Sequence, residues 1–148
     1  MKCPHCRSDA TEVFNSRSTK FGNQIWRRRR CTTCNHTFTT YEAPDLTYIK
    51  IAKRHSKKLE SYSKAKLFSS IYGAFSDIKA KASTIDAVTD TVEAKLLDME
   101  QAEISTEEIA TIVLQTLKHF NTTAFVRYLS NQTDLVSEAQ LRKELKRY

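Results

Sequence analysis

Four cysteines constrain the fold of this chain more than any other feature, because they form two Cys-x-x-Cys pairs separated by 24 residues. Each short pair turns two thiolates toward one point, and soft sulfur ligands suit zinc in a closed tetrahedral site. The spacing therefore predicts one structural zinc ion per chain. The predicted ligands are Cys3, Cys6, Cys31 and Cys34.

Two other uses of these cysteines are weaker interpretations. A disulfide framework belongs to secreted chains, and the N-terminal segment Met1–Cys6 lacks the apolar core of a secretory signal. A redox-active pair is expected beside a βαβ pattern, which this sequence does not show. Because cysteine fills all four positions, the site leaves no place for a catalytic water. We expect the metal to stabilise the fold.

The residues around the two pairs favour short β-strands. Residues with high β-propensity occupy 11–14, 25–30 and 37–41, and a turn is expected at 21–24. Two cysteine knuckles linked by antiparallel strands make a zinc ribbon, which we predict for residues 1–42. A segment of about 40 residues cannot bury a stable core, so metal binding would supply the free energy of folding.

A run of four arginines lies in the second of these predicted strands. The guanidinium fork pairs with phosphate and with guanine through two parallel hydrogen bonds, so the run indicates nucleic-acid binding. Side chains alternate between the faces of a strand, so at most two of the four share a face. A solvated basic strand is the alternative. The predicted DNA-binding residues are Arg17, Arg27, Arg28, Arg29 and Arg30, with Arg7 and Lys20 as possible extensions.

The positive charge is concentrated in the N-terminal part of the chain. The net charge is +7, yet residues 67–148 hold 9 basic and 12 acidic residues, so residues 1–66 carry the whole excess. This asymmetry indicates a polyanionic partner. A cluster of cations over 53–66 can hold a polyphosphate beside a helix N-terminus, or can simply be solvated. The cluster comprises Lys53, Arg54, Lys57, Lys58, Lys64 and Lys66.

The rest of the chain predicts a mainly helical domain over residues 49–136. Residues 43–48 are expected to form a linker, and strands at 48–54 and 59–62 are expected to pair as a β-hairpin. Four helices should follow, with a charged, loosely held helical tail at 137–148. The predicted fold class is therefore α+β, with a small β zinc ribbon preceding the helical domain.

Polar residues mark the expected starts of three of these helices. Ser63 and Ser83 are the predicted N-caps of the first two, and Ser105 with Glu108 forms a capping box at the third. Ile104 and Ile109 fit a hydrophobic staple at that start. The apolar stripes that predict the core are Leu67, Ile71, Phe75 and Ile78; Ile85, Val88, Val92 and Leu96; Ile109, Ile112, Val113, Leu117 and Phe120; and, in a fourth helix at 121–130, Phe125, Tyr128 and Leu129.

The sequence also excludes some classes of function. It contains no nucleophile–base pair and no glycine-rich phosphate loop, and its four histidines are scattered, so an enzyme is not expected. No apolar run approaches the ~20 residues of a membrane span, so no membrane partner is expected. These features predict a cytoplasmic protein.

The order of these motifs resembles the NrdR family, the bacterial repressors of ribonucleotide reductase genes. The resemblance covers residues 1–136, and its N-terminal motifs are the more specific. The matching segments are Met1–Cys6, Asn15–Arg17, Ile25–Cys34 and Phe38–Glu42 in the ribbon, and Lys53–Arg54, Glu60–Leu67, Ile104–Thr106 and Ala124–Tyr128 in the second domain.

The resemblance implies a zinc ribbon followed by an ATP-cone, a domain that senses ATP and dATP. In such a repressor the cone sets the homo-oligomeric form, and that form controls binding of the ribbons to promoter operators in double-stranded DNA. The implied location is the bacterial cytoplasm, at the nucleoid. Residues that fall near the nucleotide contacts of the cone are Ile51, Lys53, Arg54, Glu60, Lys66 and Thr106.

Several positions depart from the family pattern, and they leave the operator and the nucleotide preference open. A generic zinc-ribbon protein that binds RNA or DNA, with a helical protein-interaction domain, is the alternative function. A fragment of a reductase enzyme is a much weaker alternative than the generic ribbon protein, because no catalytic domain follows and every cysteine is assigned to metal. The departures are Asn15, Trp26, Arg30, Thr37, His55–Ser56 and Asn131–Thr133.

Overall fold

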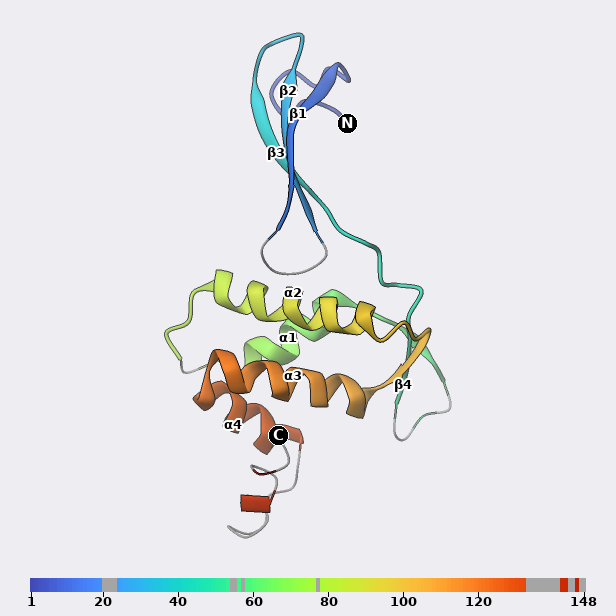
Figure 1. Ribbon diagram of the computed structural model, residues 1–148, viewed down its shortest axis with the longest axis vertical. Helices are drawn as coiled ribbons and strands as arrows, with labels where there is room; N and C mark the ends of the chain where they lie inside the picture. Colours follow the sequence, from blue (N-terminus) through green and yellow to red (C-terminus); the bar gives the residue numbers. More distant parts are fainter. Residues whose placement is uncertain are drawn as a thin grey trace. The chain divides into compact units, whose positions relative to one another are not determined.

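The computed structural model describes residues 1–19, 24–53, 56, 58–76, 78–132, 142, 143 and 146. The chain divides into two compact units, Met1–Asp45 and Leu46–Tyr148, which Figure 1 traces along the chain. Some predictions fall outside the described residues. They concern Lys20, Arg54, His55, Lys57, most of the turn at 21–24, and most of the tail at 137–148.

The first unit is an antiparallel sheet with the strand order β1-β2-β3. β1 spans Thr11–Ser18, β2 spans Ile25–Cys31 and β3 spans Thr37–Glu42, so all three predicted strands are present. β1 extends well beyond its predicted end at Phe14. Phe14 is the extra residue of a β-bulge, where the register of β1 against β2 shifts by one residue. Beyond the bulge, β1 remains paired with β2 as far as Ser18.

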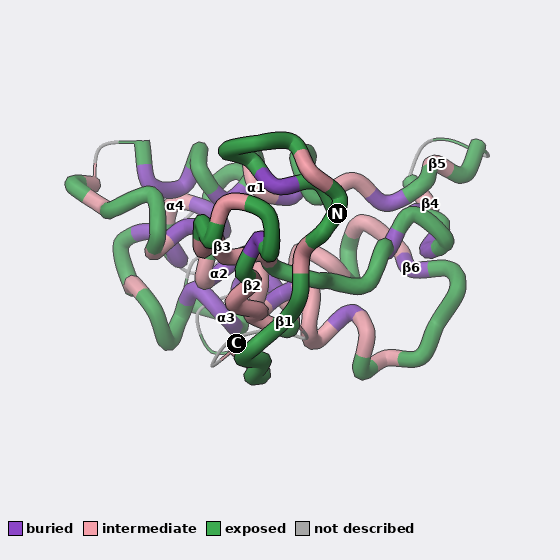
Figure 2. Tube along the Cα trace, turned by 90° about the horizontal axis from the view of Figure 1, so that it is seen from above, coloured by how far each residue is buried: buried purple, intermediate pink, exposed green. Residues whose placement is uncertain are grey.

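This first unit has almost no apolar core. Among its described residues only Cys3 and Cys31 are buried, whereas Phe14 and Tyr41 expose 50% and 64% of their surface. Figure 2 shows the three strands largely as exposed or intermediate. Little hydrophobic free energy is therefore gained when the unit folds, and the cysteine cluster must supply most of the stabilisation.

The second unit begins with a small sheet of order β5-β4-β6. The predicted hairpin is present as β4, Lys50–Ala52, paired antiparallel to β5, Glu60–Ser61. The third strand, β6 at Glu103–Ser105, was not predicted, and it pairs in parallel with β4. Ile104, predicted as part of a hydrophobic staple, lies opposite Ile51 in this ladder and is buried.

Four helices span residues 64–132 among the described residues of the second unit, as predicted. They are α1 at Lys64–Ala74, α2 at Ala82–Asp98, α3 at Thr106–Phe120 and α4 at Thr122–Gln132. α1 packs against α2 and α4, and α3 packs against the same two helices (Figure 1). No helix within the described residues is long and apolar enough to cross a membrane.

A hydrophobic cluster of described residues lies between these helices and the small sheet. It contains most of the predicted stripe residues and also Leu46, which lies inside the predicted linker at 43–48. The fully buried members include Ile49, Ile71, Val88, Val92, Leu96, Ile104, Val113, Leu114, Leu117 and Leu129. This unit therefore has its own core and does not depend on the cysteine cluster.

The helix starts confirm the capping box at α3 and the N-cap position of Ser63, and they correct the prediction for Ser83; the end of α3 corrects the prediction for Phe120. The capping box at α3 is present, since the Ser105 hydroxyl accepts from the Glu108 N–H and the Glu108 carboxylate accepts from the Ser105 N–H. Ser83 is not an N-cap, because α2 begins at Ala82 after Lys81. Ser63 precedes α1, but its hydroxyl makes no capping hydrogen bond. Phe120, predicted in the apolar face of α3, is 39% exposed.

Candidate functional site

The four predicted zinc ligands lie together in the first unit. Their Sγ atoms are all within 4.8 Å of one another. The Cys3 and Cys34 sulfurs are 3.7 Å apart, and those of Cys6 and Cys31 are 3.5 Å apart. A tetrahedral ion with zinc–sulfur bonds of about 2.3 Å requires sulfurs about 3.8 Å apart. The cluster fits one such ion.

The two cysteine pairs are held by matching backbone turns. The Arg7 N–H donates to the Cys3 carbonyl at 2.8 Å, and the Asn35 N–H donates to the Cys31 carbonyl at 2.9 Å. Both residues have a positive φ, 60° for Arg7 and 56° for Asn35, as a tight reversal requires. Each turn directs the two thiols of its pair toward the shared centre.

The electrostatics of the cluster also favour a bound cation. The backbone N–H of Cys34 is the main cause that lowers the pKa of Cys31, to about 6. An N–H of His36 lowers the pKa of Cys34, but desolvation and the three neighbouring thiols raise it more strongly, to about 12. One thiolate therefore forms readily, and the full set requires a compensating positive charge.

The ribbon sheet separates the predicted arginines into two sets. In an antiparallel pair, directly opposite residues share a face. Trp26 lies opposite Arg17 of β1 and Tyr41 of β3, so these residues share a face with Arg28 and Arg30, which we call the Trp26 face. Arg27 and Arg29 alternate onto the other side with Glu42, which we call the Glu42 face.

On the Glu42 face both guanidinium groups are already paired. The Arg27 Nη2 atom lies 2.9 Å from one oxygen of Glu42, and the Arg29 Nη2 atom lies 3.5 Å from the other. Arg29 also donates from Nε to the Thr40 hydroxyl, and its side chain is only 15% exposed. These contacts fix both arginines on the sheet, and because the two guanidinium groups share one carboxylate, one positive charge remains on this face.

On the Trp26 face the guanidinium groups contact rings and hydroxyls. The guanidinium carbon of Arg17 lies 4.5 Å from the centre of the Trp26 ring, and that of Arg30 lies 5.2 Å from the centre of Phe14. Arg28 donates to the hydroxyls of two threonines of β3. Within the described residues these three arginines form no salt bridge, so their charges can meet phosphate.

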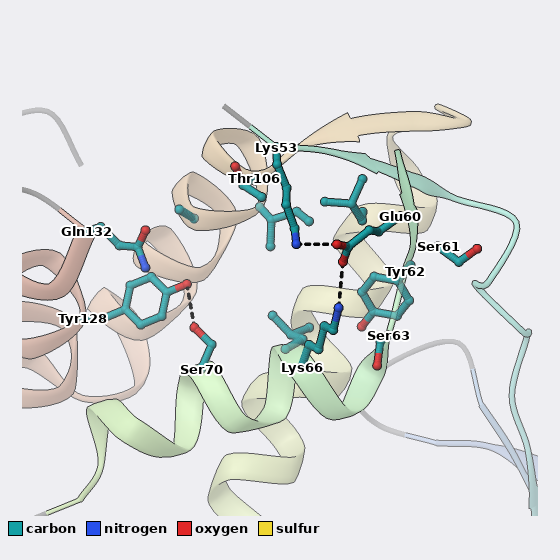
Figure 3. A pocket seen from close by; sticks show the side chains of 14 residues that line it. Lys53, Glu60, Ser61, Tyr62, Ser63, Lys66, Ser70, Thr106, Tyr128 and Gln132 are labelled. Carbon is teal, nitrogen blue, oxygen red and sulfur yellow. Dashed lines mark hydrogen bonds and ion pairs between the residues drawn. The ribbon is translucent and has the colours of Figure 1, made fainter. Parts of the chain in front are cut away.

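A second candidate site is a pocket of about 270 Å³ in the helical unit, shown in Figure 3. Its volume is close to the lower end of the range of ligand pockets, which is about 300–1,000 Å³. The structure brings together every described residue that the family resemblance assigned to nucleotide contacts. These residues are Ile51, Lys53, Glu60, Lys66 and Thr106; Arg54 lies outside the described residues.

One carboxylate connects the two lysines of the pocket. The Lys53 Nζ atom lies 2.5 Å from one Glu60 oxygen, and the Lys66 Nζ atom lies 2.7 Å from the other (Figure 3). These contacts, that of Lys53 first, lower the pKa of Glu60 to about 2. Glu60 thus occupies the position between the cations that a phosphate group would take.

The N-terminal end of α1 adds further positive potential to the same end of the pocket. Ser63, Lys66 and Leu67 line the pocket from this helix start, and no acidic residue lies in its first turn. Unpaired N–H groups and the helix dipole favour an anion there. Lys64, also predicted in the cation cluster, instead contacts Asp90 and Glu93 of α2, both at 2.6 Å.

Several lining residues were not predicted to contact a nucleotide. Ser70 continues the face of α1 that carries Lys66, and its hydroxyl lies 3.3 Å from the hydroxyl of Tyr128 on α4. Burial raises the pKa of Tyr128. Only the packing of α1 against α4 places these groups at one pocket. The other unpredicted lining residues are Ser61, Tyr62, Ile109, Ala110 and Gln132.

Tyr62 anchors the pocket wall to α2. Its ring is buried, and its hydroxyl donates to Glu93 at 2.9 Å. Burial and the neighbouring Glu93 carboxylate raise the pKa of Tyr62 well above its usual range. Glu93 also accepts a hydrogen bond from Lys64, so Tyr62 and Lys64 both connect the start of α1 to α2.

Comparison with known proteins identifies relatives of both units. Residues 1–42 match the family described as the N-terminal domain of NrdR-like transcriptional repressors, and residues 49–136 match the ATP cone domain. The chain is similar to the transcriptional repressor NrdR of Gloeothece citriformis, with 38% identity over 130 residues, covering 88% of this chain and 72% of that protein. It is also similar to the NrdR of Polynucleobacter necessarius, with 35% identity over 149 residues, covering 99% and 100%.

Proposed function

Since the chain belongs to the NrdR family of transcriptional repressors, we propose that it represses ribonucleotide reductase genes through nucleotide-controlled binding to promoter operators. Its relatives are named as repressors and not as enzymes. One observation carries the proposal. An arginine face on a metal-stabilised sheet and a lysine-lined pocket occupy two separate folding units of one chain.

The zinc ribbon supplies the DNA contact. The four cysteines bind one zinc ion, which holds the two knuckles and thereby the sheet that carries the arginines. We assign double-stranded DNA to the Trp26 face, because Arg17, Arg28 and Arg30 form no salt bridge with a described carboxylate, although Glu12 lies opposite Arg30. Arg27 and Arg29 lie on the opposite face of the sheet, where their ion pairs with Glu42 connect β2 to β3.

The ATP-cone supplies the nucleotide response. Lys53 and Lys66 bind the phosphates of ATP or dATP at the start of α1, and Glu60 releases the two lysines and accepts from a ribose hydroxyl. Ile51 and Thr106 line the same end, and Arg54 belongs to the proposed set by its position in the family motif. The occupied cone sets the homo-oligomer, which spaces the ribbons on DNA in the bacterial cytoplasm.

Calorimetry with ATP and dATP tests the nucleotide site. Lys53→Ala and Lys66→Ala should each weaken binding by about 10-fold or more, because each removes one charge-assisted contact with phosphate. Lys58→Ala is the matched control, because Lys58 is an exposed lysine of the same hairpin that does not line the pocket. No binding by the wild-type chain would reject the proposal and favour the generic ribbon protein.

A further inference from the structure

Trp26 lies on the ribbon sheet without a hydrophobic core to explain its position. Among the described residues of this unit only Cys3 and Cys31 are buried, and Trp26 does not belong to the hydrophobic cluster of the helical unit. Its cross-strand neighbours are Arg17 of β1 and Tyr41 of β3, and Tyr41 is 64% exposed. The role of the ring is therefore defined by its contacts on the sheet face and not by core packing.

The guanidinium group of Arg17 lies over this ring. Its carbon atom is 4.5 Å from the ring centre, within the range of a cation–π contact. Arg17 is exposed and Trp26 is half-buried, so the arginine side chain lies at the solvent side of the sheet. A guanidinium group that stacks on an aromatic face directs its N–H groups outward in its own plane, where they can meet an oxygen acceptor.

Arg17 is far from the part of the sheet that the metal site holds. β2 ends at Cys31, which pairs with Thr11, whereas Arg17 pairs with Trp26 near the opposite end of the ladder. Trp26 precedes Cys31 by five residues, which corresponds to about 17 Å along the strand. The zinc ion thus stabilises the sheet, but the orientation of the Arg17 side chain depends on a local contact.

An aromatic ring orients an arginine in a way that suits a polyanionic partner. A carboxylate also orients a guanidinium group, but it offsets the positive charge, as Glu42 does for Arg27 on the opposite face. A ring leaves the charge available to phosphate. A long side chain that is already ordered in the free protein loses less conformational entropy on binding. Trp26 therefore lowers the entropic cost of a phosphate contact by Arg17.

We propose that Trp26 is a positioning residue for DNA binding, and that its ring holds the Arg17 guanidinium group in the orientation that contacts a DNA phosphate. The inference rests on the DNA binding proposed above and adds how one of the arginines is oriented. Trp26 acts through Arg17 and not through a DNA contact of its own. A separate pair, Arg30 at 5.2 Å from the centre of the Phe14 ring, provides an internal control.

Tryptophan fluorescence of the zinc-loaded chain tests the contact in the free protein. Trp26 is the single tryptophan, so selective excitation reports on this ring alone. Arg17→Ala should uncover the ring and move its emission to longer wavelength, whereas Arg30→Ala should leave the emission as in the wild type. Identical emission spectra of the wild type and Arg17→Ala would overturn the contact on which the role depends.

Binding of the full zinc-loaded chain to a random-sequence DNA duplex, measured across a salt series, tests the role itself. Arg17→Ala should weaken binding and reduce the salt slope by about one unit. Trp26→Leu should weaken binding by about 5-fold with an unchanged slope, because the charge of Arg17 remains. In the Arg17→Ala background Trp26→Leu should cause no further loss, whereas in the Arg30→Ala background it should again cost about 5-fold.

A conservative variant guards against a folding defect. Trp26→Phe retains a ring beneath Arg17 and should recover most of the affinity that Trp26→Leu loses. If Trp26→Leu binds as the wild type does, or loses the same affinity with and without Arg17, the positioning role is overturned. Those results leave DNA binding intact, whereas a wild-type chain that binds no duplex rejects the proposed function itself.

Discussion

At the scale of single residues, Glu60 sets the electrostatics of the pocket. Its pKa is about 2 instead of the ordinary 4.5, so the pairing with the lysines is complete above pH 4.5 and is lost as the pH falls toward 2. A carbon-13 NMR titration of its carboxyl should give a midpoint near 2 in the wild type. Lys53→Ala should raise the midpoint toward 4.5, and Lys58→Ala should leave it unchanged; equal midpoints in all three proteins would contradict the pairing.

Tyr62 provides a second residue-level prediction, because its hydroxyl bonds to the charged Glu93 carboxylate. Tyr62→Phe keeps the ring and removes this bond, and it should lower the free energy of unfolding by about 1–2 kcal/mol. Urea denaturation followed through the helical signal measures the change. Tyr48→Phe, at a tyrosine that is 56% exposed, should have no comparable effect. A loss of equal size in both variants would show that the hydrogen bond is not the cause.

The residues of the two sites were predictable to different extents. Cys3 and its three partners follow from spacing alone, and Lys53 and Lys66 follow from charge and motif order. Ser70 could not be found in this way, because its neighbours are neutral and it reaches the pocket only when α1 packs against α4. Gln132 was marked only as part of Asn131–Thr133, a segment that departs from the family pattern. The pairing of the arginines with Glu42 likewise required the register of β2 against β3.

At the scale of single elements, Ser105 caps α3 whereas Ser83 does not cap α2, so replacing each serine by alanine should affect stability differently. Ser105→Ala removes the side chain that accepts from the Glu108 N–H, and should cost about 1 kcal/mol. In the helical unit this corresponds to a fall in Tm of about 4 °C or more. Ser83→Ala should cause no loss, because Ser83 lies within the first turn of α2, where alanine is the better helix former. Calorimetric melting curves compare the two, and a larger loss at Ser83 would contradict the observed start of α2.

The element-level errors have a common physical cause. The capping box indicates where α3 begins, but it cannot show that Ile104 just before it pairs with Ile51, because that parallel ladder joins segments far apart in the sequence. Phe120 was assigned to the core from its period in the helix. It lies at the last residue of α3, where the helix leaves the cluster, and is therefore exposed.

At the scale of the whole molecule, the two units should differ in their dependence on metal. Cys31→Ser removes one zinc ligand and should unfold residues 1–45, while residues 46–148 keep their hydrophobic cluster. The single tryptophan, Trp26, lies in the ribbon, so its fluorescence reports on that unit alone, and far-ultraviolet circular dichroism reports on the helices. A variant that contains no metal but retains native tryptophan fluorescence would reject the role of zinc in folding.

The coupling of the two units provides the last prediction. The arginines lie on the ribbon and the nucleotide pocket lies in the other unit, so a nucleotide can act through the oligomer it favours. One ribbon contacts few base pairs, and linking ribbons raises DNA affinity only when their spacing matches the half-sites. Arg28→Ala should weaken DNA binding and reduce its salt dependence by about one unit of slope, without changing the oligomer that each nucleotide favours.

Two further variants complete this test. Arg27→Ala, on the Glu42 face, should change the salt slope less than Arg28→Ala, because its charge is already paired with Glu42. Lys66→Ala should retain the weak affinity of the separate ribbons and lose the response to nucleotide. Mobility shifts across a salt series, combined with light scattering, measure both quantities. If ATP or dATP changes DNA affinity while the oligomeric state stays constant, the proposed coupling through oligomerisation is wrong. The cone would then have to act on the ribbon of the same chain directly.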